Sequence, residues 1–229
     1  MNKQFHQLAP ILALAQMPDK FRAFFIAQNY TEEQLKIDAD IPDEVDKDNL
    51  LQDAEIHHAH SYKLREITDA KGNKHLDYLD GDCLQRLKGL AADAHDFYRE
   101  GKLDMVRYTL AKMTHYRIDA LTYPHLHKGR PWSKHHEAFE THMGHFIVQH
   151  APEIGQLKFE ACEDIYKAAR VTALAAWYEG RDLVELYEQG KCVPDETALM
   201  VCKRCVQAVG SLWITLAQEL KILEVENDG

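Results

Sequence analysis

The chain has 229 residues, of which 45% are hydrophobic and 28% are charged, and its formal net charge is −10. This length suffices for one domain with a sizeable core, and we expect residues 1–229 to form a single domain. A large acidic excess repels the phosphate backbone of long nucleic acids, so the charge argues against a dedicated nucleic-acid-binding protein. It leaves open an enzyme that holds one phosphate through metal ions, because bound divalent cations reverse the local field.

The sequence carries no clear signal for export or for membrane insertion. No apolar run reaches the length of a membrane span, and the apolar stretch 8–15 is short and interrupted by Pro10. We therefore expect no cleaved signal peptide, no transmembrane segment and a cytoplasmic rather than a secreted protein. Five cysteines in no regular framework argue against a disulfide-stapled fold. The CxxC at Cys202 and Cys205 lies in an apolar-periodic stretch, which favours two partly buried helical thiols.

The apolar spacing predicts helices along nearly the whole chain. In order, we expect helices over residues 3–16, 19–28, 44–66, 75–99, 102–121, 132–149, 158–189 and 197–224. Residues 30–43 read as a less regular, acidic segment, residues 70–73 as a break, and Pro124 as the end of a helix. Strand-like alternation is almost absent. The predicted fold class is all-α, a bundle of about seven or eight helices with no pattern that indicates an oligomeric state.

The most informative window lies between Thr114 and His145. Eight of the fourteen histidines fall between His115 and His150. His115 and Asp119 are four residues apart, as are His136 and Glu140, and residues at this spacing share one face of a helix. His125 follows Pro124, where a bend can direct it back to the same space. Imidazoles paired with carboxylates suit zinc, and also manganese or iron, so this window predicts a polynuclear metal site.

This pattern resembles the zinc-dependent phospholipase C and single-strand-specific nuclease superfamily, a group of all-helical phosphodiesterases. His115-x3-Asp119-x5-His125 fits the spacing of that superfamily residue for residue, and His136-x3-Glu140 fits its second half. The superfamily also has an Asp followed some fourteen or fifteen residues later by a His, and an early His near the N-terminus. The counterparts in this chain are Asp43, then His57 or His58, and His6.

The resemblance implies a buried cluster of about two or three zinc ions, with manganese or iron as alternatives. The first would be held by Asp43, one of His57 and His58, His115 and Asp119; the second by His125, His136 and Glu140; and the third by His6 and a bridging Asp119. His57 and His58 point about 100° apart on a helix, so only one of them is expected to share an ion with His115. In the superfamily an N-terminal Trp completes the third site, whereas this sequence starts with Met1.

The implied function is a metal-dependent phosphoric-ester hydrolase, in which activated water attacks phosphorus and Asp43 and Asp119 are the catalytic carboxylates. The expected substrate is a small phosphate ester or a phospholipid headgroup. Two other interpretations stay open. His95-Asp96 is the dyad of HD-type metal phosphohydrolases, although so short a motif often occurs by chance. A helical metal-binding module without turnover would use the same ligands in a closed site.

Overall fold

The computed structural model describes residues 4–27, 30–48, 60–127 and 130–224. Within these residues the chain is mostly helical, which confirms the predicted fold class, and it adds one two-stranded sheet. The described helices, several of them short, are α1 (Gln4–Leu14), α2 (Asp19–Phe25), α3 (Glu32–Asp48), α5 (Cys83–Arg99), α6 (Leu103–Asp119), α7 (Tyr123–Leu126), α8 (Arg130–Gln149), α9 (Ala151–Ile154), α10 (Ile165–Gly180), α11 (Val184–Glu188) and α12 (Asp195–Glu219).

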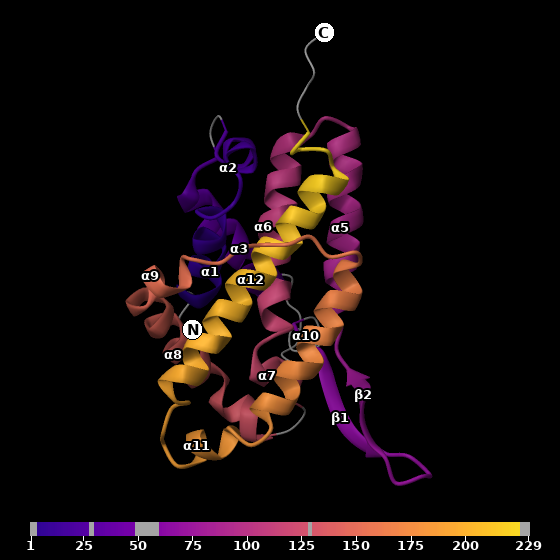
Figure 1. Cartoon of the computed structure of the whole chain (residues 1–229), viewed down its shortest axis with the longest axis vertical. Helices are drawn as coiled ribbons and strands as arrows, with labels where there is room; N and C mark the ends of the chain where they lie inside the picture. Colours follow the sequence, from indigo (N-terminus) through magenta and orange to yellow (C-terminus); the bar gives the residue numbers. More distant parts are fainter. Residues whose placement is uncertain (1–3, 28–29, 49–59, 128–129, 225–229) are drawn as a thin grey trace.

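Helices α1, α6 and α12 form the centre of the bundle. Helix α1 contacts α3, α6, α8 and α12, while α6 packs between α5, α3 and α12. Figure 1 shows α12 running diagonally across the bundle, with α5 and α6 side by side behind its C-terminal part. The N-terminal helix is therefore an integral part of the core, and it brings the start of the chain next to α6.

The long C-terminal helix α12 is the core of one half of the molecule. Trp213 is fully buried, lies against the rings of Phe21 and Phe25, and donates a hydrogen bond from Nε1 to the carbonyl of Leu110 at 3.1 Å. In the described part of the chain, α12 alone is long and apolar enough to cross a membrane, and 67% of its most apolar window is buried inside the structure. Such burial is what a core helix of this composition requires.

The acidic segment expected to be irregular is largely the helix α3, and Pro42 lies inside it. The prediction of a loop rested on Asp38, Asp40 and Pro42. Asp38 is instead 3% exposed and accepts hydrogen bonds from the hydroxyl of Tyr30 at 2.7 Å and from Gln34 Nε2 at 2.8 Å. Because local donors satisfy the buried carboxylate, the acidic residue does not require a solvated loop.

The prediction of helices over 44–66 and 75–99 was wrong on both sides of the break at 70–73, where residues 63–66 and 75–80 form strands. Strands β1 (Lys63–Thr68) and β2 (Lys74–Asp80) pair there as an antiparallel hairpin. In its turn, Asp69 Oδ1 accepts hydrogen bonds from the backbone N–H groups of Lys71 and Asn73, and Gly72 adopts φ 84°. The residues of the hairpin are half-buried or exposed except for Leu64 of β1, which is buried. So little burial leaves almost no alternation in hydrophobicity, which explains why the strands were missed.

Two helical glycines allow a matched test of the packing. A Cβ on Gly180 would lie 2.6 Å from the fully buried ring of Tyr123, whereas a Cβ on Gly89 in α5 would meet nothing within 4 Å. We expect Gly180→Ala to lower the free energy of unfolding by about 1–3 kcal/mol through overpacking. Gly89→Ala should raise it by about 0.5–1 kcal/mol through helix propensity. Urea denaturation of both variants checks this, and equal effects would contradict the described packing of α10 on α7.

Candidate metal centre

Eight side chains from the centre of the bundle converge on one buried site. His6 comes from α1, Asp43 from α3, His60 from the residues before β1, His115 and Asp119 from α6, His125 from α7, and His136 and Glu140 from α8. They form three groups in which the candidate ligand atoms all lie within 4.8 Å of one another: His6, His115 and Asp119; Asp43, His60 and His115; and His125, His136 and Glu140.

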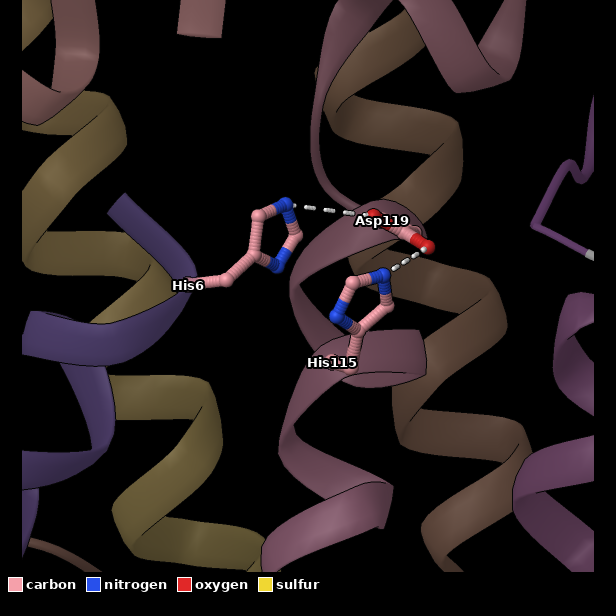
Figure 2. Close-up of side chains that lie close together, drawn as sticks. All are labelled: His6, His115 and Asp119. Atoms are coloured by element: carbon pink, nitrogen blue, oxygen red, sulfur yellow. Dashed lines mark ion pairs between the residues drawn. The ribbon is translucent and has the colours of Figure 1, made fainter. Parts of the chain in front are cut away.

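The first group joins the N-terminal helix to α6 (Figure 2). His6 Nε2 lies 3.5 Å from Asp119 Oδ1, and His115 Nε2 lies 3.5 Å from Asp119 Oδ2. The two imidazole rings stack with their centroids 4.2 Å apart. The single turn of α6 between His115 and Asp119 thus presents both side chains to His6, as their i,i+4 spacing predicts.

The second group shares His115 with the first. His115 Nε2 lies 3.5 Å from Asp43 Oδ1, and His60 Nδ1 lies 2.8 Å from Asp119 Oδ2 and 4.0 Å from Asp43 Oδ1. His115 Nδ1 is 3.0 Å from the carbonyl oxygen of Ala39, which can only accept a hydrogen bond. This bond assigns the ring proton to Nδ1 and leaves Nε2 with a lone pair directed at the carboxylates, as in metal-binding histidines.

The third group surrounds Glu140. Its Oε1 lies 2.7 Å from His136 Nε2, 3.4 Å from His125 Nε2 and 3.6 Å from His6 Nε2. His125 Nε2 is also 3.5 Å from Asp119 Oδ1. His6 and His125 therefore contact both Asp119 and Glu140, so the three groups form one continuous cluster. His136 has 19% of its side chain exposed and lies at the solvent side of its group.

Burial and charge shift the ionisation of the cluster in opposite directions. Burial alone would raise the pKa of Asp119, but the neighbouring imidazoles of His125, His115 and others hold it well below its usual range. The pKa values of Asp43 and Glu140 are likewise lowered by histidines in spite of burial. All three carboxylates are consequently ionised at neutral pH and supply negative charge in a region with almost no solvent.

The histidines of the cluster divide into two kinds. Burial would lower the pKa of His115, yet Asp119 and Asp43 outweigh it and raise the pKa; Glu140 does the same for His136. For His125 burial dominates and lowers the pKa to about 4, so this imidazole is neutral at neutral pH. A neutral imidazole beside an ionised carboxylate is the protonation state in which both groups bind a divalent cation.

The spacing of the cluster fits a transition-metal ion better than direct hydrogen bonding. Ligands at 2.0–2.2 Å in a tetrahedral zinc site lie about 3.3–3.6 Å from one another. Most contacts between imidazole nitrogen and carboxylate oxygen here are 3.4–3.6 Å. Among the described residues, Asp119 Oδ1 and Glu140 Oε2 are buried without a hydrogen-bond partner. Buried polar atoms are rarely left unsatisfied, so these residues fit a bound cation.

Seven of the residues singled out in the sequence are brought together, namely His6, Asp43, His115, Asp119, His125, His136 and Glu140. His57 and His58 lie outside the described residues. Sequence reasoning passed over His60, which lies in the place expected for one of them. The expected helix over 44–66 made spacing decisive, whereas residues 60–62, just before β1, are not helical. The sequence did offer one indication of this ligand, because His60 is the third of three closely spaced histidines, after His57 and His58.

Lys63 is a second residue that the pattern did not reveal. It stands at the start of β1 and donates a hydrogen bond from Nζ to the carbonyl of Pro124 at 2.5 Å. Burial lowers its pKa to about 8, and Asp119 partly opposes this shift. The ammonium group of Lys63 therefore interacts electrostatically with Asp119, although Lys63 is not one of the candidate ligands.

The motifs of the rival interpretations lie elsewhere. His95 Nε2 is 2.9 Å from Glu219 on the bundle surface, and Asp96 pairs with Arg99. Neither joins a metal-ligand group among the described residues. Cys202 and Cys205 are both buried in α12, and burial raises the pKa of each thiol. The CxxC therefore belongs to the core.

Comparison with known proteins gives a likeness of fold. No protein-family profile matches the sequence, and no curated protein matches it. The crystal structure of the alpha-toxin of Clostridium perfringens, isolated from avian strain SWCP, is similar with a TM-score of 0.57 and 16% sequence identity. The alignment covers 93% of this chain and 63% of the toxin chain, so this chain spans somewhat less than two thirds of the toxin's length. At this identity the likeness concerns the fold, and it extends over nearly all of the present chain.

Proposed function

We propose that the protein is a metal-dependent phosphoric-ester hydrolase of the phospholipase C and nuclease type, with zinc as the preferred ion. One observation carries the proposal. Asp119 and Glu140 each contact several buried imidazoles, and the distances between imidazole nitrogen and carboxylate oxygen are typical of ligands that share an ion. A site for one structural ion would need about four ligands, whereas this cluster offers eight side chains that share carboxylates. Shared carboxylates are characteristic of polynuclear hydrolytic centres.

The chemistry follows from the ligand set. His115 and Asp43 with His60 would hold one ion, His125, His136 and Glu140 another, and His6 with Asp119 a third. Ions in such a cluster supply a nucleophile at neutral pH and neutralise charge on a phosphoryl group. The chain itself positions these ligands: the carbonyl of Ala39 orients the His115 ring, and α6 fixes the spacing of His115 and Asp119.

Two further points support a phosphate ester as the substrate. The order of the ligands along the chain resembles the zinc-dependent phospholipase C and nuclease superfamily, and the likeness to the clostridial alpha-toxin adds support at the level of the fold. The net charge of −10 disfavours long nucleic acids, which leaves a small phosphate ester or a phospholipid headgroup.

Removing one shared ligand should abolish activity. We expect His115→Ala to reduce hydrolysis of bis(p-nitrophenyl) phosphate by more than about a hundredfold, because even partners of metal ligands cost 10–100-fold when lost. His95→Ala is the matched control, since its imidazole pairs with Glu219 at the surface. Elemental analysis should show less zinc in the first variant only. Stoichiometric metal without turnover in the wild type, with any of zinc, manganese or iron, would instead indicate a metal-binding module.

A second comparison separates three neighbouring histidines. His60 lies within the ligand groups, while the sequence pattern favoured His57 or His58. We expect His60→Ala to lose at least one zinc ion per chain, and parallel His57→Ala and His58→Ala variants show whether either of those histidines also holds an ion. Circular dichroism of each variant controls for unfolding. Retention of full zinc content by His60→Ala would refute its assignment as a ligand.

Metal affinity should depend on pH in a defined direction. The pKa values of His115 and His136 are raised by carboxylates, so protons compete for these imidazoles as the pH falls through a range that starts above 6.5. Affinity is therefore complete above that range and lost below it. We expect the logarithm of the zinc association constant to fall by roughly one or more per pH unit as the pH falls through that range. Competition with a chromogenic chelator measures this, and a flat profile between pH 8 and 6 would contradict it.

A further inference from the structure

A second pocket lies on the opposite side of α6 from the metal cluster. It has a volume of about 430 Å³ and is bounded by α10, α12 and residues 158–162, with Arg117 of α6 among its lining residues. Figure 1 shows the segment before α10 crossing over α12, and this segment covers part of the pocket. Its volume falls in the range of about 300–1,000 Å³ that is typical of sites for small molecules.

Arg117 is the unusual group in this pocket. It is 5% exposed, and its Nη2 donates a hydrogen bond to Thr172 Oγ1 at 3.0 Å, while Nη1 is buried without a partner among the described residues. No carboxylate of the described residues pairs with it. A guanidinium group cannot discharge by losing its proton, and a buried charge without a counter-ion is strongly unfavourable. Arg117 therefore has no negative partner among the described residues.

The other charged residues of the lining are also mostly basic. Arg204 donates to Glu179 Oε2 through Nη2 at 2.5 Å, while its buried Nη1 has no partner among the described residues. Lys158 lies at the exposed mouth, where Glu160 is the one carboxylate of the lining. Three cations thus line one pocket in a chain of net charge −10, and Arg117 is the buried one that meets no carboxylate among the described residues.

Apolar side chains complete the pocket, with Ile165, Ala208 and Leu212 among them. Its cover is held in place by hydrogen bonds from the backbone N–H of Cys162 to Thr215 Oγ1 at 3.0 Å and from Gln207 Nε2 to the carbonyl of Lys158 at 2.8 Å. The ring of Phe159 packs on Gly210, where a Cβ would lie 2.4 Å from it. These contacts form the pocket in advance of any ligand.

The pocket is separate from the metal cluster. Arg117 is two residues from both His115 and Asp119, so it points about 200° away from them around α6. None of the candidate metal ligands lines the pocket. We propose that this pocket binds a small amphipathic anion, with its carboxylate or phosphate head on Arg117 and a short apolar tail against Ile165 and Leu212.

The test is calorimetric titration of the zinc-loaded full chain with octanoate, octyl phosphate and, as the neutral analogue, 1-octanol. We expect at least one of the two anions to bind and 1-octanol to bind at least about tenfold more weakly, the effect of a charge-assisted hydrogen bond. Arg117→Met should weaken anion binding by at least the same factor. Arg99→Gln, which changes an exposed arginine of α5, is the matched control and should leave it unchanged.

A second variant guards against a purely structural role of Arg117. Ala168→Leu keeps the guanidinium group and fills part of the pocket, so it should also abolish anion binding while leaving zinc content and phosphodiester hydrolysis intact. Binding that persists in both variants would place the anion outside this pocket and overturn the proposal. So would an affinity for 1-octanol equal to that for the anion that binds, or no binding of either anion to the wild type.

Discussion

The complete burial of Asp119 is the constraint on which the rest of the site depends. An ionised carboxylate in the interior is tolerated only if positive or hydrogen-bonding groups surround it. Imidazoles from α1, α6 and α7, with His60 before the hairpin, meet that demand. The bundle is assembled so that these separate segments reach one point, and the packing of α1 against α6 and α8 is part of this arrangement.

Helix α6 supplies charged side chains to two sites on opposite sides of it. One face presents His115 and Asp119 to the cluster of candidate metal ligands, and the other presents Arg117 to the pocket between α10 and α12. Every residue near the C-terminal end of this helix is buried, including the charged ones. A helix with charge on both faces cannot rest on apolar contacts alone, so its neighbours must supply specific polar partners on each side.

The sequence predicted the position of a side chain where its separation from a neighbouring residue along a helix fixes which face it lies on. The pairs on α6 and α8 were predictable because an i,i+4 separation fixes a shared helical face. His6 and Asp43 came from resemblance, since no local rule brings α1 and α3 to α6. His60 and the hairpin were missed because residues 60–68 are not helical, so the i,i+4 rule does not apply to them. Arg117 could not be singled out from the sequence, because only the structure shows that no carboxylate of the described residues pairs with it.

The span of the ligands along the chain has a consequence for how the protein unfolds. An ion held jointly by His6 and Asp119 would tie α1 to α6, closing a loop of about a hundred residues. A covalent link across such a loop disfavours the unfolded chain by roughly 4–5 kcal/mol in the chain-entropy model. Coordination would act as a reversible version of that link, so the resistance of the N-terminal helix to proteases would follow the supply of metal ions around it.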